Sequence, residues 1–417
     1  MPGGVAPVAE AADPREGVPT VIVDPDALQA YATSLAAGTG PLAVDAERAS
    51  GYRYSQRAYL IQLRRAGAGT ALVDPTMLED LGVLQQASWD VEWILHAATQ
   101  DLPCLAEVGF RPARLFDTEL AGRLLGRERV SLAALVESEL GQVLRKGHGA
   151  ADWSVRPLSP ELLQYAALDV EWLIELREVL YAELESTGKL SLAEEEFTAL
   201  LDFAPRERRE DPWRRTSGIH RIRKPRALAV ARSLWQARDA LAQRIDIAPG
   251  RVLPDAAIVA AAAAMPESLQ ALSAMKEFAG RGQQRRLQTW WSAIGHALAL
   301  PDAQLPTTSS PATGPPPPRA WAEKDPAAWA RLQCAREALG AESERRRIPV
   351  ENLISPELIR QVCWDPPTEP TADRIGGILQ GAGARRWQVA LAVPILAEAM
   401  QASVHTQPAE DEGVTGQ

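Results

Sequence analysis

Two pairs of residues in this sequence have spacings that let their side chains act together. Asp45 and Glu47 follow the apolar run 41–44, which predicts a buried strand, and residues two apart on a strand point to the same face. Tyr165 and Asp169 are four apart in a helical stretch, so they share one face of a helix. Two elements can therefore present three carboxylates and a phenol to a common point.

A fourth carboxylate belongs to Asp101, which follows the strand-like run 93–97 and opens the helix-periodic segment 101–108. Acidic side chains that gather at one end of a sheet repel one another unless cations lie between them. Carboxylate oxygens are hard ligands, which favour Mg²⁺ or Mn²⁺ over softer metals. The pattern therefore indicates a two-metal site for phosphoryl transfer. The alternative is a set of solvated or capping carboxylates, since Asp is favoured at a helix start.

The elements that must position these side chains alternate between strands and helices in the first part of the chain. Such alternation predicts an α/β sheet domain, and beyond residue 116 the pattern becomes almost wholly helical. Strands are expected at 20–23, 42–45, 59–64, 70–73 and 93–97, and helices at 26–37 and 77–87.

Two later segments, 226–300 and 325–400, have apolar positions at the period of a helix. Each has a long helix, a charged stretch, a Pro-containing turn and a short helix, so the second segment reads as a divergent copy of the first. A Pro-rich linker separates them. We expect two small helical bundles in this part of the chain.

Composition sets wide bounds. A chain of 417 residues with 46% hydrophobic and 24% charged residues is typical of a globular protein with two or three domains. Its three cysteines, Cys104, Cys334 and Cys363, are too widely spaced for a metal or redox pair. The start of the chain lacks a secretory signal, and the longest apolar run, 256–265, is far below the roughly 20 residues that span a bilayer. We therefore expect a cytoplasmic protein without a membrane partner.

Net charge is −10, which argues against a general nucleic-acid binder. The distribution of charge is more informative, because basic residues crowd the segment 206–226. This segment is a candidate RNA contact, with a solvated linker as the alternative. Charge therefore permits a nucleic-acid enzyme without favouring one.

The wider motifs around the acids are those of a known family. The segments "LAVDAE", "GYRYSQRAYLIQL", "ILHAATQDL", "ADWSVRPLSPELLQYAALDVEWL" and "DPWRR" occur in one order. In this the chain resembles ribonuclease D and related 3′–5′ exonucleases, strongly over residues 21–215 and weakly beyond. The resemblance implies an α/β fold: a ribonuclease H-like exonuclease domain, with a mixed sheet flanked by helices, followed by one or two small all-α HRDC-type bundles.

The resemblance and the composition together predict seven segments. They are a disordered leader (1–19), the exonuclease domain (20–204), a basic linker (205–225), a first HRDC domain (226–300), a Pro-rich linker (301–322), a second, divergent HRDC-like domain (323–402) and a disordered tail (403–417).

The resemblance also implies a role for each of the five residues. Asp45 would bridge two divalent cations, Mg²⁺ or Mn²⁺, with Glu47 and Asp169 completing one and Asp101 serving the other. Tyr165 would orient the attacking water, since an unperturbed pKa near 10 suits a hydrogen-bonding group better than a base at neutral pH.

Further residues are candidate RNA contacts. Arg48 departs from the aromatic or large apolar residue that many relatives carry after the Asp-x-Glu, and its guanidinium can stack on a base instead. For Tyr54 and Arg57 a solvated surface role is the alternative. Two other residues are expected to support the fold: Asp117 by accepting backbone hydrogen bonds at a helix start, and His96 by packing at a strand end. The remaining candidate RNA contacts are Lys146, Trp153, Arg214 and Arg215.

The sequence thus predicts a divalent-metal-dependent 3′–5′ exoribonuclease that releases 5′-mononucleotides. By resemblance, its substrates would be the 3′ ends of tRNA precursors or other structured RNA. A 3′–5′ exonuclease acting on DNA and a catalytically dead RNA-binding scaffold are the alternatives. No protein partner can be deduced.

Overall fold

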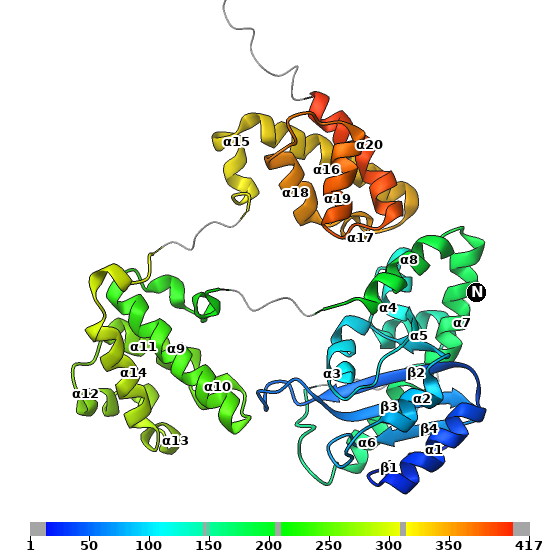
Figure 1. The fold of residues 1–417 in the computed structure, drawn as a ribbon, viewed down its shortest axis with the longest axis horizontal. Coiled ribbons are helices and arrows are strands. Elements are labelled where there is room, and N and C mark those ends of the chain that lie inside the picture. Colours follow the sequence, from blue (N-terminus) through cyan, green and yellow to red (C-terminus); the bar gives the residue numbers. More distant parts are fainter. Residues whose placement is uncertain (1–13, 145–146, 148–149, 205–209, 309–313, 403–417) are drawn as a thin grey trace, which may run out of the picture.

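The computed structural model describes residues 14–144, 147, 150–204, 210–308 and 314–402. Within them a sheet domain is followed by two helical regions (Figure 1). The first region has a core of its own, whereas the core of the second is continuous with that of the sheet domain. The strands of the sheet domain are β1 (Val21–Ile22), β2 (Thr39–Arg48), β3 (Ala58–Ala66), β4 (Gly69–Val73), β5 (Glu92–Leu95) and β6 (Arg114–Asp117).

The sheet has six strands in the order β1-β4-β3-β2-β5-β6. Strand β3 is antiparallel to β2 and β4, whereas the other pairs are parallel, so the sheet is mixed as predicted. Strand β2 pairs with β3 along most of its length but with β5 at Leu42 and Ala43. The end of β2 that carries Asp45 and Glu47 therefore runs past its pairing with β5, which leaves its edge free to border a site.

Helices cover the sheet and bury its apolar faces. Trp93 of β5 packs on Phe110 with ring centroids 4.2 Å apart, and Phe116 of β6 packs on Phe197 at 4.7 Å. The helices of this domain are α1 (Pro25–Ala37), α2 (Gly82–Ser88), α3 (Leu102–Glu107), α4 (Thr118–Leu124), α5 (Leu132–Leu140), α6 (Pro160–Asp169), α7 (Leu173–Ser186) and α8 (Leu190–Leu201), with the 3₁₀ turn η1 (Ala98–Gln100).

The two helical regions repeat one layout. In each, a helix of 21 residues ends at a residue in the left-handed conformation, Asp246 with φ 47° and Arg347 with φ 52°, and a short helix follows. The first region has α9 (Pro225–Ile245), α10 (Pro249–Val252), α11 (Asp255–Ala264), α12 (Leu269–Ser273), α13 (Arg281–Gln284) and α14 (Leu287–Ala299). The second has α15 (Trp321–Lys324), α16 (Pro326–Arg346), α17 (Val350–Leu353), α18 (Pro356–Trp364), α19 (Ala372–Gly381) and α20 (Arg386–Ala402). Short 3₁₀ turns are η2 (Pro212–Arg215), η3 (Ile219–Arg221), η4 (Lys276–Phe278), η5 (Asp302–Gln304) and η6 (Pro318–Ala320).

Two segments differ from expectation. The helix expected at 77–87 begins at Gly82, because the Asp80 carboxylate accepts the Gly82 N–H at 2.8 Å and fixes the chain just before it. The leader was expected to be disordered through residue 19, yet Arg15 forms an ion pair with the buried carboxylate of Glu171 and its guanidinium lies 4.5 Å from the Trp172 ring. None of the described helices is both long and apolar enough to cross a bilayer.

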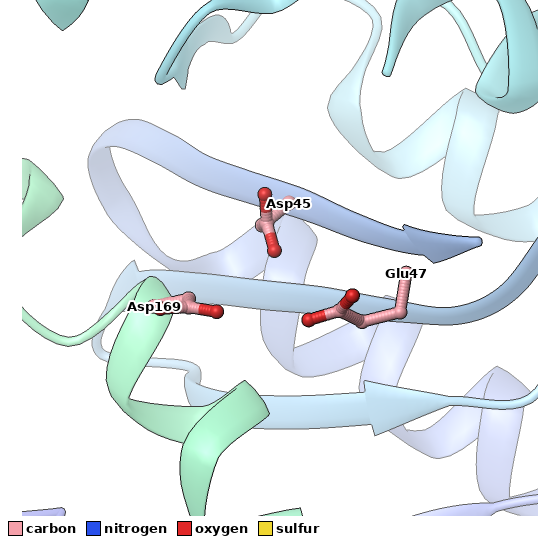
Figure 2. A group of neighbouring side chains, drawn as sticks. All are labelled: Asp45, Glu47 and Asp169. Atoms are coloured by element: carbon pink, nitrogen blue, oxygen red, sulfur yellow. The ribbon is translucent and has the colours of Figure 1, made fainter. Parts of the chain in front are cut away.

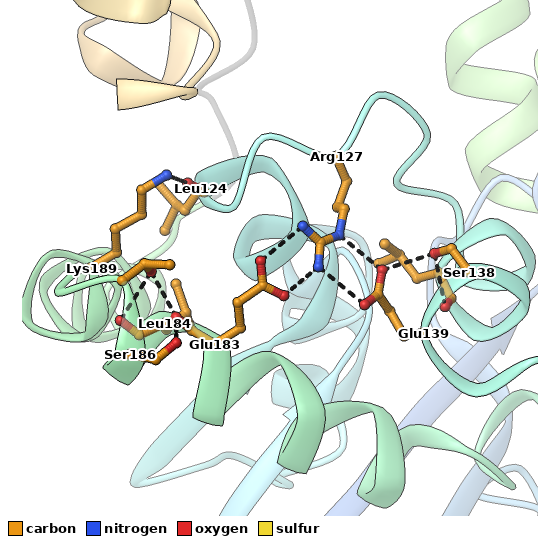
Figure 3. Close-up of polar contacts among 10 residues, drawn as sticks. Leu124, Arg127, Ser138, Glu139, Glu183, Leu184, Ser186 and Lys189 are labelled. Atoms are coloured by element: carbon orange, nitrogen blue, oxygen red, sulfur yellow. Dashed lines mark hydrogen bonds and ion pairs between the residues drawn. The ribbon is translucent and has the colours of Figure 1, made fainter. Parts of the chain in front are cut away.

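One arginine joins three elements at the edge of the sheet domain. Arg127 donates to both carboxylate oxygens of Glu139 on α5, at 2.8 and 3.1 Å, and to Glu183 on α7, at 3.0 Å (Figure 3). Ser138 also donates to Glu139 at 2.9 Å. Because these acids are partly buried and share one guanidinium, removing Arg127 leaves both without their cation.

Arg127→Ala is therefore expected to lower the free energy of unfolding by about 2 kcal/mol at pH 7. Arg127 holds the pKa of Glu139 below its ordinary value of 4.5. The contribution is thus complete above pH 4.5 and is lost as the pH falls through the lowered value. Urea denaturation at neutral and acid pH measures it. Arg129→Ala is the matched control, since that side chain is 77% exposed. A wild-type advantage that persists unchanged at acid pH would contradict the assignment.

Candidate active site

Three of the predicted acids meet at the end of β2. Asp45, Glu47 and Asp169 each place one carboxylate oxygen within 4.8 Å of the others, and Figure 2 shows the three groups converging. Asp45 and Glu47 share a face of β2 because strand side chains alternate, and Asp169 is the last residue of α6. Ser159 caps the start of α6 by accepting the Leu162 N–H at 3.4 Å. The spacing of the oxygens suits a divalent cation between them.

All five predicted residues border one cavity of about 420 Å³. Besides the three converging acids, Asp101 and Tyr165 lie in its wall. The other residues lining it are Ala46, Arg48, Ser50, His96, Gln100, Leu132 and Leu173. A polar cavity of this size is within the usual range for a small-ligand site.

Asp101 stands before α3 but does not cap it with its side chain. The side chain is 5% exposed and borders the cavity, outside the group of three oxygens within 4.8 Å. Asp117 instead caps α4 by accepting the Leu120 N–H at 3.0 Å, and it also accepts the N–H groups of Ala97 and Ala98 at 3.2 and 2.8 Å. The expectation that Asp117 supports the fold is confirmed.

Burial raises the pKa of each of the four acids in the cavity, and repulsion from neighbouring acids adds to the effect at Glu47, Asp101 and Asp169. Burial raises the pKa of Asp45 to about 6, against the lowering effect of the Ala46 N–H and Arg48. Burial, with repulsion from Asp45, Asp169 and Asp101, raises the pKa of Glu47 to about 10. Burial and the charge of Asp45 also raise the pKa values of Asp101 and Asp169. Divalent cations would relieve this cost, so these residues fit a metal centre.

Tyr165 keeps its proton at every pH of interest. Burial raises its pKa above 10, and the charges of Asp169 and Glu47 raise it further. Its hydroxyl hydrogen-bonds to Asp169. A protonated phenol at the wall of the cavity can orient a water or a phosphate oxygen, but it cannot act as a base near neutral pH.

His96 lines the same cavity from the end of β5. Its Nδ1 lies 2.9 Å from the Thr118 hydroxyl, and burial lowers its pKa to about 4. The imidazole is therefore neutral at physiological pH. This bears out the expectation of a packing role at a strand end.

The candidate RNA contacts have different surroundings. Arg48 lines the cavity, with Nη2 3.5 Å from Oε1 of Gln100. Tyr54 donates its hydroxyl to Asp239 of α9 at 3.1 Å, so this phenol serves a contact between domains. Arg57 is exposed, with its guanidinium 4.9 Å from the Tyr59 ring.

Trp153 was predicted to contact RNA, and this prediction is wrong. Its side chain is fully buried and packs toward Tyr165, with ring centroids 6.3 Å apart. The polar residues beside it in the sequence suggested a loop surface, but the indole turns inward against α6. Its role is to support the wall that carries Tyr165.

The two predicted contacts in the basic segment, Arg214 and Arg215, differ in exposure. Arg214 donates to Asp211 at 2.8 Å and to the Thr307 carbonyl at 3.1 Å, and it stacks on Trp213. Arg215 is exposed. Lys146 lies outside the described residues.

Two buried residues near the acids were missed by sequence reasoning. Gln62 is opposite Asp45 in the β2–β3 register, fully buried, and neither amide atom has a protein partner among the described residues. Glu171 follows Asp169 by two residues, is 1% exposed and pairs with Arg15. For Gln62 the available signal was a glutamine inside the apolar run "YLIQL". For Glu171 there was no signal in the sequence, because its partner Arg15 is 156 residues away.

Family models match all three parts of the chain. A 3′–5′ exonuclease model matches residues 19–185, an HRDC domain model residues 227–294, and a model described as the 3′ to 5′ exonuclease C-terminal domain residues 314–400.

Individual relatives agree with these models. Ribonuclease D of Acidiphilium cryptum is 34% identical over 299 residues, which cover 69% of this chain and 74% of the relative. A crystal structure of a protein from Bifidobacterium adolescentis superposes with a TM-score of 0.87 at 39% identity, covering 94% of this chain and 99% of that one. Escherichia coli RNase D, titled an exoribonuclease involved in structured RNA processing, gives 0.66 at 26%, covering 92% and 98%.

Glu47→Gln is expected to stabilise the metal-free protein. The raised pKa of Glu47 means that its carboxylate costs the folded state more and more as pH rises above the ordinary value of 4.5. The advantage of the variant should be absent below pH 4.5 and reach about 2 kcal/mol at pH 7 in chelator. Urea denaturation over this range tests it, with the exposed Glu107→Gln as the matched control. A variant less stable than wild type at pH 7 would show that the carboxylate is already compensated.

Proposed function

Because this chain belongs to the ribonuclease D family and is a 3′–5′ exoribonuclease, we propose that two divalent cations, Mg²⁺ or Mn²⁺, bound by Asp45, Glu47, Asp101 and Asp169, support that activity. The observation that carries the proposal is the convergence of Asp45, Glu47 and Asp169 oxygens within 4.8 Å. Their raised pKa values are a second support, since bound cations would offset the cost of burying these carboxylates.

The reaction is hydrolysis of the last phosphodiester bond. Water attacks phosphorus, the bond from phosphorus to the 3′-oxygen breaks, and that oxygen takes up a proton as the 5′-mononucleotide leaves. When bound, the cations would lower the pKa of the attacking water and offset the negative charge that develops on the leaving oxygen. The protein's remaining task is to place the terminal nucleotide and the water in line.

Two side chains are suited to this placement. Tyr165 presents a permanently protonated hydroxyl to the cavity and would orient the attacking water. Arg48 reaches the cavity from the end of β2 and would lay its planar guanidinium against the terminal base.

The proposed substrates are single-stranded 3′ ends of structured RNA, tRNA precursors among them. The family and the E. coli relative support RNA as the substrate class. The helical regions would hold the body of the RNA. Arg215, and Arg57 in the loop between β2 and β3, are exposed cations available to phosphate.

Asp45→Asn and Asp169→Asn are each expected to lower kcat by about a thousandfold or more, because each removes an anionic side chain that would hold a cation. The assay follows stepwise shortening of 5′-labelled RNA, and mononucleotide release from uniformly labelled RNA, in Mn²⁺ and in Mg²⁺, with DNA of the same sequence alongside. Glu107→Gln, an equal change of charge on α3, should leave the rate unchanged. Calorimetry should show Mn²⁺ binding in wild type that weakens in both variants. Full activity in chelator would refute the metal-dependent mechanism.

Tyr165→Phe is expected to lower kcat by roughly 10- to 100-fold with little change in KM, because it removes one hydrogen bond from the attacking water. Metal affinity should stay near that of wild type, which separates this loss from that of the acids. Single-turnover assays on short RNA measure the effect. A rate equal to wild type would assign the phenol to packing.

A further inference from the structure

The loop that leaves the active site along β2 is docked on another domain. Residues 49–57 connect β2, two residues after Glu47, to β3. Ser50 of this loop lines the catalytic cavity. The far side of the loop lies against the corner between α9 and α10 of the first helical region, residues 245–251.

Asp246 is the centre of this contact. One carboxylate oxygen accepts the backbone N–H of Ser55 at 2.8 Å, and the other lies 3.4 Å from the hydroxyl of Tyr59. Asp246 ends α9 in the left-handed conformation, φ 47°, which turns its side chain off the helix axis toward the loop. One residue thus closes a helix and binds the catalytic domain.

The corner also satisfies two carbonyls of the loop. The Ala248 N–H donates to the Tyr52 carbonyl at 2.9 Å, and Nε of Arg251 donates to the Gly51 carbonyl at 2.7 Å. The Arg251 guanidinium also lies 4.1 Å from the Tyr52 ring. Backbone groups of the loop therefore find their partners on a different domain.

The near side of the loop reaches the wall that carries Tyr165. Nε of Arg53 donates to the Ser154 hydroxyl at 2.7 Å, and the next residue back, Trp153, packs toward Tyr165. The loop's own bonds within residues 49–53 run from the Tyr52 and Arg53 N–H groups to the Ala49 carbonyl. Residues 51–55 thus depend on the corner for one side and on the Tyr165 wall for the other.

We propose that the corner 245–251 is a positioning element of the active site: Asp246 and Arg251 fix the loop 49–57 and, through it, the rim of the cavity. The inference rests on the proposed function. A domain that merely holds RNA matters for long substrates. A domain that sets the rim matters equally for a substrate too short to reach the helices.

The test compares two substrates in Mn²⁺: a single-stranded 20-mer RNA and the shortest RNA that wild type cleaves, starting from a dinucleotide. Asp246→Gly removes the carboxylate and introduces a residue that adopts φ 47° without steric cost. Arg251→Ala removes the second contact from a separate element. Each is expected to lower kcat about tenfold, by the same factor on both substrates. Asp246→Asn, which keeps an oxygen for the Ser55 N–H, should restore most of the rate.

Control variants distinguish a failure of loop positioning from a failure of the proposed function. Arg281→Ala removes one exposed cation of the same region and should leave the short-substrate rate unchanged. Hydrogen exchange at the Ser55 amide should speed up in Asp246→Gly while the unfolding midpoint holds. A loss confined to the 20-mer, or no loss on either substrate, would overturn the inference. If wild type cleaves neither RNA, or Asp45→Asn cleaves as fast as wild type, the proposed function fails instead.

Discussion

Repulsion among buried carboxylates is the constraint that the rest of this structure serves. Asp45, Glu47 and Asp169 hold oxygens within 4.8 Å, and Asp101 adds a fourth acid to the same cavity. Two unit charges at 4 Å interact by about 4 kcal/mol at an effective dielectric constant near 20. Such a cluster would spread apart on flexible loops. It is held because its members stand on a central strand, at a helix end and beside a capped turn, none of which can relax separately.

The supports of these acids are themselves polar and lie just outside the cavity. Asp117 ties the 97–98 backbone, which leads to Asp101, to the start of α4. Arg15 pairs with Glu171, which lies two residues after the end of α6. Asp117 reaches a backbone N–H 20 residues away, and the Arg15–Glu171 ion pair joins residues 156 apart, so both supports come from outside the local segment.

The sequence predicted the cavity well because local periodicity places its residues. Alternation on a strand put Asp45 and Glu47 on one face, and four-residue spacing put Tyr165 beside Asp169. The same local reasoning failed for Trp153, whose polar neighbours in sequence say nothing about the α6 face that covers it. Contacts across domains were beyond reach for the same reason. The bond from Ser55 to Asp246 spans 191 residues, and no pattern on either side marks it.

The two helical regions each dock on the sheet domain through the same kind of corner. In both, the long helix ends at a left-handed residue, and in both that corner meets the sheet domain. The first corner uses the Asp246 carboxylate on the 49–57 loop. The second uses the Arg347 backbone: its carbonyl lies 3.5 Å from Nζ of Lys189, and a Cβ on Gly126 would come within 2.5 Å of it. Gly126, with φ 79°, is thus required by both its own conformation and this approach. One backbone turn therefore makes two docking points whose side-chain chemistry differs. Among the described residues, the first corner contacts the loop that borders the acids. The second region instead lines a cavity with Ala97 and Asp117, the residues that lead to Asp101.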